Sequence, residues 1–382
     1  MRSVGMIAEF NPLHNGHVHA LSLARQQANA DVVVVVMSGN YVQRGEPAIV
    51  DKWARTDMAL HAGADVVVEL PVNFAVQAGQ QFAEGGIALL KGLQVDTIAF
   101  GTENPELDFN AIAAKRIAAE ASGSGDFADY TQTYASQLTE FYAHEVGMKL
   151  TAPNTMLALA YAEANLRAGK PMQLLPIRRV GAQHDADGTD AVFSSGSALR
   201  KLLRAGASIH GQTPDFAEQL LLTNAHFSWH EIWPLLAYRL QTATLPELRT
   251  IDQMSEGLEY RLVKAAQIAG NFDAFLRAVK SKRYTYARLR RLALATVLNM
   301  TQAEVTAARM RPIAHVLGFT TAGQEFLHSI KKTAGVPIIT KVSHDMLAPT
   351  GPMYLTHRSD ALYRSFTGRD QNFGRKPLML HN

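Results

Sequence analysis

The residues best suited to chemistry are two histidines near the N-terminus, His14 and His17, with a glycine between them. They lie where a turn signalled by Asn11-Pro12 passes into a helical stretch. The first turn of a helix presents free backbone N–H groups and a partial positive charge, which together favour phosphate. Two imidazoles add donors toward the same point, and the glycine lets a ring or a phosphate approach the backbone. This spacing predicts a phosphate-binding site.

Two other interpretations of the histidine pair are a metal site and a plain helix cap. The chain has no cysteine and no evident third ligand, so a dedicated metal site is not expected. The strand–loop–helix context favours phosphate over simple capping.

Five short runs rich in Val, Ile and Leu predict the strands that must position this loop. Buried strands of four to eight residues, alternating with helical stretches, are typical of a doubly wound parallel sheet in an α/β fold. Ligands of such sheets bind at the carboxyl ends of the strands, where residues 9–17 lie. The runs are Val4–Ala8, Val32–Met37, Val66–Leu70, Thr97–Phe100 and Gln173–Ile177.

The second half of the chain differs from the first in pattern and in charge. Residues 1–200 carry 14 basic and 21 acidic side chains, whereas residues 201–382 carry 23 and 13. Helical periodicity predominates after residue 203, with extended pieces expected at Ile313–Leu317 and Val336–Thr340 and an extended tail at the C-terminal end. We therefore expect a nucleotide-binding domain over residues 1–207 and a mainly α-helical, basic domain over residues 208–382.

A basic segment within that second half predicts contact with RNA. Residues 274–303 carry seven Lys and Arg side chains and no acidic one, and Tyr284 and Tyr286 lie among them. Basic side chains bind phosphates, and aromatic rings stack on unpaired bases. The alternative is a helix whose arginines are merely solvated. The residues expected to bind RNA are Lys280, Lys282, Arg283, Arg288, Arg290 and Arg291.

The composition excludes several classes of protein. The absence of cysteine excludes a disulfide scaffold, a thiolate metal site and a cysteine nucleophile. The longest apolar run, Val32–Met37, is far shorter than the roughly 18–20 residues that cross a bilayer. The first ten residues predict a strand and not a signal peptide. We expect a cytoplasmic protein without a membrane partner; the oligomeric state is left open.

Ordered motifs carry a resemblance to a known family. A strand followed by H-x-G-H at a helix start resembles the nucleotidyltransferases with a HIGH-type motif, and Phe193–Arg200, FSSGSALR, resembles their second signature. Further blocks resemble the bacterial tRNA(Met) cytidine acetate ligases within that superfamily. These blocks are GMIAEFNPLHNGH (5–17), SGNYVQRGEPAIVDKW (38–53), GADVVVELP (63–71), FGTE (100–103), APN (152–154) and KRYTYARLRR (282–291).

The resemblance implies a Rossmann-like nucleotidyltransferase fold and a two-step reaction. Acetate and ATP give acetyl-adenylate and pyrophosphate, and the acetyl group then passes to the exocyclic amine of the wobble cytidine of elongator tRNA(Met), giving N4-acetylcytidine. His14 and His17 are the expected catalytic pair, and Mg²⁺ is expected to accompany ATP. The implied ATP-binding residues are Ile7, Ala8, Glu9, Phe10, Asn11, Pro12, Leu13, His14, Asn15, Gly16, His17, Val18, His19, Ala20, Gly101, Asn154, Arg179, Ser195 and Ser197.

Some roles stay open on the sequence. Asn154 follows a proline at a helix start and is compatible with an N-cap as well as with a ligand contact, and Arg200 is expected near the triphosphate. Residues 38–57 are interpreted as a cover for acetyl-adenylate, as the receptor of the cytidine, or as a surface loop in which Asp51 caps a helix. Two other functions are considered: a cofactor adenylyltransferase of the same superfamily, and a non-catalytic RNA-binding protein on the same fold.

Overall fold

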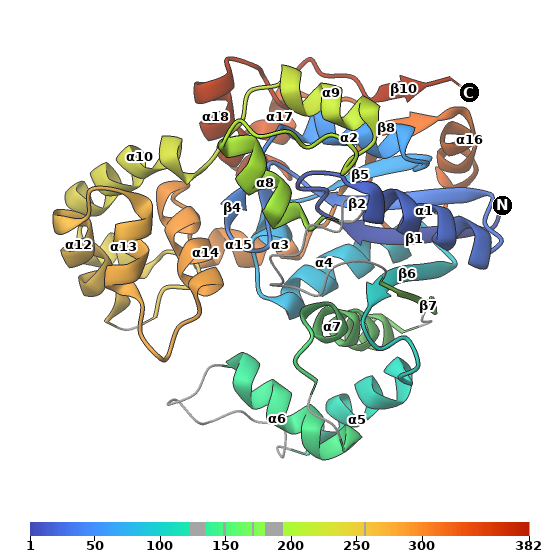
Figure 1. The fold of residues 1–382 in the computed structure, drawn as a ribbon, viewed down its shortest axis with the longest axis horizontal. Coiled ribbons are helices and arrows are strands. Elements are labelled where there is room, and N and C mark those ends of the chain that lie inside the picture. Colours follow the sequence, from blue (N-terminus) through green and yellow to red (C-terminus); the bar gives the residue numbers. More distant parts are fainter. Residues whose placement is uncertain (123–133, 148–149, 170–171, 180–193, 256, 382) are drawn as a thin grey trace.

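The computed structural model describes residues 1–122, 134–147, 150–169, 172–179, 194–255 and 257–381. Within these residues the molecule is built on one large sheet in the strand order β10-β8-β5-β2-β1-β6-β7, with β9 paired to β8 (Figure 1). Its strands are β1 (Ser3–Ala8), β2 (Val32–Ser38), β5 (Val66–Leu70), β6 (Thr97–Thr102), β7 (Gln173–Arg178), β8 (Ala314–Thr320), β9 (Ile338–Ile339) and β10 (Leu378–Leu380).

The five strands predicted from the sequence are confirmed as β1, β2, β5, β6 and β7, and they are mutually parallel. The chain builds outward from β1 to β2 and β5, and then returns to the other side of β1 with β6 and β7. The strand order therefore reverses between β1 and β6. In a doubly wound sheet the ligand crevice opens at that switch point, at the carboxyl end of β1.

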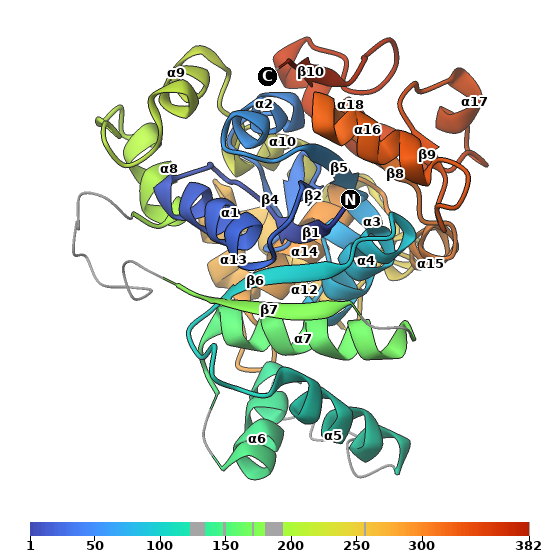
Figure 2. The same ribbon diagram turned by 90° about the vertical axis from the view of Figure 1, so that its right-hand side faces the viewer.

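Successive side chains of β2 point to opposite faces of the sheet, and each face is covered by a layer of helices. Val34 joins one hydrophobic core with Phe82 of α4, whereas Val35 joins a second core with Leu21 of α1 and Trp53 of α2. Both sets are buried because helices cover both faces (Figure 2). One layer holds α1 (Asn15–Gln27), α2 (Lys52–His61), α8 (Gly196–Arg204) and α9 (Asp215–Thr223); the other holds α3 (Val72–Ala75), α4 (Gly79–Gly92), α5 (Phe109–Ala121), α6 (Tyr134–Val146), α7 (Pro153–Arg167) and α16 (Thr321–Ile330).

Helices of the second half form a separate group beside the sheet (Figure 1, yellow to orange). Their own core includes Phe275 and Leu289, with Trp229 stacked on Phe272 at 3.7 Å between ring centroids. Tyr41, from the segment after β2, packs into the same core and joins the group to the sheet. The members are α10 (Trp229–Thr242), α11 (Leu245–Arg249), α12 (Leu258–Ile268), α13 (Phe272–Val279), α14 (Tyr286–Val297) and α15 (Gln302–Arg309).

The C-terminal part returns to the sheet. β8 lies antiparallel to β5, and β9 and β10 pair with β8, so the predicted extended pieces are confirmed as strands of the main sheet. The division of the chain after residue 207 stays a prediction; β8, β9 and β10 follow that residue in the sequence but belong to the main sheet. Two short strands, β3 (Tyr41–Val42) and β4 (Glu46–Pro47), form a separate hairpin.

The predicted extended tail is wrong. The segment contains α17 (His344–Leu347) and α18 (Tyr354–Thr367) before β10. The inner face of α18 mixes Leu355 and Tyr363 with buried Asp360, so its apolar periodicity is weak although the helix is packed. Among the described residues, no helix combines the length and the apolar character that crossing a membrane requires.

Candidate nucleotide site

The loop after β1 is held in place from several sides. Phe10 adopts φ +45°, and Asn11-Pro12 is a cis peptide. Asn11 Oδ1 accepts a hydrogen bond from the Ile49 amide at 2.8 Å, and Arg200 donates to the Asn11 carbonyl at 2.6 Å. Bonds to the side chain and the backbone of the same residue fix the path of the chain into α1.

The two histidines open α1 as predicted. His14 is the N-cap residue, and its backbone N–H donates to Nδ1 of His17 at 3.3 Å. Because Nδ1 of neutral His17 accepts this bond, its remaining proton lies on Nε2. The two rings stack with centroids 3.7 Å apart, and Phe10 packs edge-on against His17 at 5.0 Å. The rings are therefore held rigidly at the carboxyl end of β1.

Both imidazoles are neutral in the free protein at neutral pH. Burial, with a smaller effect of Arg179, lowers the pKa of His14 to about 4. Burial, together with His14 and Arg179, holds the pKa of His17 well below its ordinary value. Nδ1 of His14 is buried and has no hydrogen-bond partner among the described residues. Both rings are therefore uncharged beside the nucleotide loop.

Three further predicted residues, Gly101, Asn154 and Arg179, line the same cavity as the histidines. Asn154 donates to Glu103 Oε1 at 2.6 Å, and Arg179 donates to Asn154 Oδ1 at 3.5 Å. A Cβ added to Gly101 would lie 3.2 Å from Cγ of Arg179, so a side chain there would crowd the arginine. The interpretation of Asn154 as an N-cap is wrong, because α7 is capped by Ala152 and begins at the proline before Asn154.

The second predicted signature is only partly described, because Phe193 lies outside the described residues. Ser195 is the N-cap of α8, accepts a hydrogen bond from the Ala198 amide at 3.2 Å, and lies 3.0 Å from the hydroxyl of Ser197. Arg200 holds the first loop and bonds Glu46 at 3.3 Å. It therefore holds the loop in this structure, and its position near the triphosphate stays a prediction.

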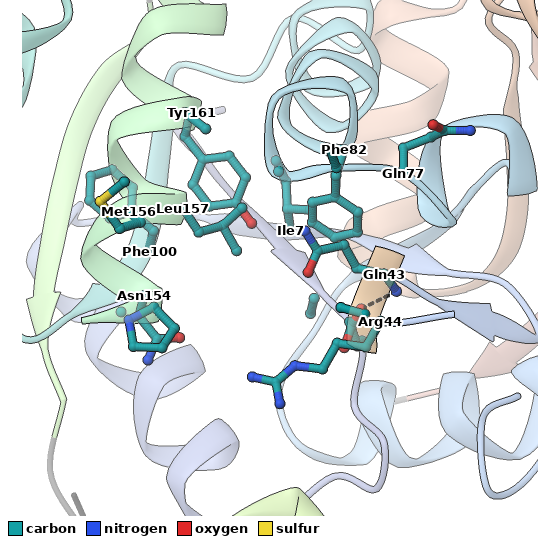
Figure 3. Close-up of a pocket in the computed structure, with 18 of the residues that line it drawn as sticks. Ile7, Gln43, Arg44, Gln77, Phe82, Phe100, Asn154, Met156, Leu157 and Tyr161 are labelled. Carbon is teal, nitrogen blue, oxygen red and sulfur yellow. Dashed lines mark hydrogen bonds between the residues drawn. The ribbon is translucent and has the colours of Figure 1, made fainter. Parts of the chain in front are cut away.

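One cavity of about 1220 Å³ joins these groups (Figure 3). Its apolar side is lined by Ile7, Phe82, Phe100, Leu157 and Tyr161, which come from β1, α4, β6 and α7. The predicted ATP-site residues that line it are Ile7, Ala8, Glu9, Phe10, His14, Gly16, His17, His19, Ala20, Gly101, Asn154, Arg179 and Ser195; those that do not are Asn11, Pro12, Leu13, Asn15, Val18 and Ser197.

Residues 38–57 are mostly buried, so their interpretation as a surface loop is wrong, although Asp51 does cap α2 by accepting from the Ala54 amide at 2.8 Å. Gln43 and Arg44 of this segment line the cavity. The Gln43 amide donates to Glu9 at 2.7 Å, while burial raises the pKa of the Glu9 carboxyl. The segment is thus part of the cavity wall.

A buried ionic network supports this segment from behind. Nζ of Lys52 contacts both carboxylate oxygens of Glu69 at 2.8 Å, Asp360 at 2.7 Å and Asn372 at 2.9 Å. Burial acts to lower the pKa of Lys52, but the two carboxylates outweigh it and raise that pKa. His315 bonds the second oxygen of Glu69 at 2.7 Å. The network ties α2 to β5, β8 and α18.

The six predicted RNA-binding residues differ in exposure. Lys282 and Arg283 are exposed, whereas Arg291 is buried and donates to Gln253 at 3.1 Å and to the Gln43 carbonyl at 3.4 Å. Arg290 lies 3.7 Å from Glu46. Those that line the cavity are Arg283, Arg288 and Arg291; those that do not are Lys280, Lys282 and Arg290.

The contact between the hairpin and α14 brings the basic segment to the nucleotide loop. A Cβ on Gly45, at φ +74°, would lie 2.4 Å from the Arg291 amide nitrogen, so only glycine allows this approach. Trp229 also donates to the Gly45 carbonyl at 2.9 Å. The cavity therefore runs from the histidines to α14.

Several cavity residues were missed in the sequence analysis. Gln77, Gln80 and Gln81 lie in a polar run between two apolar stretches, a signal that could have identified them. Asp252 and Gln253 come from an irregular connection between helices, where neither periodicity nor a motif marks them.

The strand order, the switch-point cavity and the H-x-G-H helix start define a nucleotide-binding protein of the HIGH type. A family model described as HIGH Nucleotidyl Transferase matches residues 1–376, and the chain belongs to that family.

Relatives with more specific names match over the whole chain. A tRNA(Met) cytidine acetate ligase of Latilactobacillus sakei is 44% identical, covering 100% of this chain and 98% of its own. The protein of the same name from Lactiplantibacillus plantarum is also 44% identical, and the match covers 100% of this chain and 99% of that protein. The crystal structure of Thermotoga maritima TmcAL, apo form I, matches with a TM-score of 0.88 at 28% identity over 100% of both chains. The form bound with alpha-thio ATP matches with a TM-score of 0.86, also at 28% identity over 100% of both chains.

Proposed function

We propose that this protein is an ATP-dependent acetate ligase that acetylates a cytidine of tRNA(Met). It joins acetate to AMP with release of pyrophosphate, and passes the acetyl group from acetyl-adenylate to the exocyclic amine of the wobble cytidine of elongator tRNA(Met), giving N4-acetylcytidine. The observation that carries the proposal is one cavity that joins the paired histidines of α1 to the basic helix α14. Full-length relatives named for this reaction support it.

The nucleotide end of the cavity suits the first step. Attack of a carboxylate oxygen on the α-phosphorus places negative charge on the non-bridging oxygens and on the leaving pyrophosphate. Nε2–H of His17 and the side chain of His14 would face that charge from the helix start, and Arg179, which lines the same cavity and whose charge acts on both histidines, would add a cation. Prearranged donors of this kind stabilise the transition state without a covalent intermediate on the protein.

Acetate fits between the polar and apolar parts of the same cavity. Its carboxylate has to reach the α-phosphorus beside the histidines, which leaves the methyl group for the apolar side formed by Ile7, Phe82, Leu157 and Tyr161. Mg²⁺ accompanies ATP, since this ion is commonly held in part by the substrate phosphates.

The RNA end of the cavity suits the second step. Arg283 and Arg288 line the cavity where α14 begins, and Lys282 is exposed beside them. These cations can bind the phosphates on either side of an unstacked nucleotide, whose base then enters toward the adenylate. A cofactor adenylyltransferase has no need of such a surface.

Labelled acetate tests the proposal directly. We expect acetate-dependent exchange of pyrophosphate into ATP by the purified protein, and transfer of label to a tRNA(Met) transcript. A matched transcript with uridine at the wobble position should take up no label. Exchange that needs a phosphorylated cofactor in place of acetate would contradict the proposal, and so would equal labelling of the two transcripts.

A further inference from the structure

The part of the cavity beside α14 has a polar wall built from three separate parts of the chain. Gln77 follows α3, Asp252 and Gln253 follow α11, and Arg291 lies on α14. Gln77 donates to Asp252 Oδ2 at 2.8 Å, Gln253 lies 3.4 Å from the same oxygen, and Arg291 donates to Gln253 at 3.1 Å. All of them line the cavity, so this wall faces the space that connects the nucleotide loop to α14.

Asp252 is unusual within this wall. It is 8% exposed, and its amide donates to the Met300 carbonyl at 2.9 Å, which fixes the backbone. Its Oδ2 accepts from both glutamines, whereas no donor among the described residues bonds its Oδ1. Arg291 and Arg309 are near enough for their charges to interact with that of Asp252. A fixed carboxylate thus presents one open acceptor in the part of the cavity that Gln77, Gln253 and Arg291 line.

The carboxylate of this wall would repel a phosphate, but it can accept a hydrogen bond from an amino group on a base. A carboxylate repels the RNA backbone, which the nearby arginines attract. Aspartate and glutamate accept hydrogen bonds from the N4 amine of cytosine, which is the group acylated in the proposed reaction. Arg283, Arg288 and Asp252 line the same cavity, so a base whose phosphates the arginines bind shares the space that the carboxylate faces.

We propose that Asp252 binds the exocyclic amine of the target cytosine and accepts its proton during acetyl transfer. The inference rests on the function proposed above. The amine nitrogen forms a bond to the carbonyl carbon of acetyl-adenylate, and the bond from that carbon to the phosphate oxygen breaks. AMP leaves with the electron pair, and one N4 proton passes to Oδ1 of Asp252. Gln77 and Gln253 position the carboxylate through Oδ2.

The test compares the two half-reactions in Asp252→Asn and Asp252→Glu. Asparagine keeps a hydrogen-bond acceptor but is not a base, and glutamate keeps the base. We expect Asp252→Asn to lower the rate of acetyl transfer to tRNA at least a hundredfold, in line with the usual effect of losing a general base. Acetate-dependent pyrophosphate exchange should stay within about twofold of the wild type, and Asp252→Glu should recover part of the transfer rate. Asp273→Asn, exposed on α13 of the same helical group, is the matched control.

The outcomes separate this inference from the proposed function. A wild-type rate of acetyl transfer in Asp252→Asn would overturn the proposed role of Asp252. Loss of pyrophosphate exchange in parallel with transfer would also overturn it, because Asp252 would then serve the nucleotide site or the fold. Failure of the wild-type protein to exchange pyrophosphate or to label tRNA would instead overturn the proposed function.

Discussion

Neutral histidines at the nucleotide loop should make the protein less stable in mild acid, and replacing His14 should remove part of that effect. Burial lowers the pKa of His14 from 6.5 to about 4. Above pH 6.5 the imidazole is neutral in both the folded and the unfolded chain. Below it, the unfolded chain takes up a proton that the folded protein does not, so stability falls until the folded group also titrates.

The size of the effect follows from the two pKa values. A difference of 2.5 units between 6.5 and about 4 corresponds to a limiting loss of about 3.4 kcal/mol. At pH 5 the linkage relation gives about 2 kcal/mol of that loss relative to pH 7.5. His14→Gln keeps a polar side chain but does not titrate. We therefore expect the stability of the variant to fall by about 2 kcal/mol less than that of the wild type between pH 7.5 and pH 5.

Urea denaturation followed by circular dichroism at the two pH values measures this difference. His230→Gln, which removes an exposed imidazole at the start of α10, is the control for the loss of a histidine as such. Equal pH dependence in the wild type and His14→Gln would refute the reasoning, because it would mean that His14 is as easily protonated in the folded protein as in the unfolded chain.

Three further predictions concern other parts of the molecule. Lys52→Met should destabilise the protein by about 3–5 kcal/mol in urea denaturation, because it leaves Glu69 and Asp360 buried without their cation. The exposed Lys201→Met is the control and should cost less than about 1 kcal/mol. An equally small loss in Lys52→Met would contradict the stabilising role of the network. Arg179→Ala should weaken ATP binding about tenfold or more in calorimetry, because a charge-assisted hydrogen bond contributes about 1.5–3 kcal/mol, and unchanged ATP affinity would remove Arg179 from the site. Replacing Lys282 and Arg283 by alanine should lower the salt dependence of tRNA binding by about one unit of slope per lost phosphate contact, whereas an unaltered slope would place the RNA elsewhere.

The sequence was most informative where local chemistry decides structure. Val32–Met37 is apolar at every position, as a strand buried on both faces requires, and β2 is the observed result. The H-x-G-H spacing likewise predicted the start of α1, because a helix start and two stacked rings depend on residues only three apart.

Long-range pairing could not be predicted in the same way. α18 was missed because its inner face is completed by Lys52, which lies about three hundred residues earlier and turns a polar position into a buried one. Asp252 was missed for a similar reason: its position in the cavity depends on Gln77 and Arg291, which only the folded chain brings near it. Neither pairing leaves a periodic pattern in the sequence.

The partners of Lys52 also bear on how the protein is made. A ribosome synthesises the chain from its N-terminus, so Lys52 emerges long before Asp360 and Asn372. Until those two residues leave the exit tunnel, the ammonium group has only Glu69 as an acidic partner in this network, and the segment in front of it lacks its final support. The network behind the cavity wall is therefore complete only when nearly the whole chain has been synthesised.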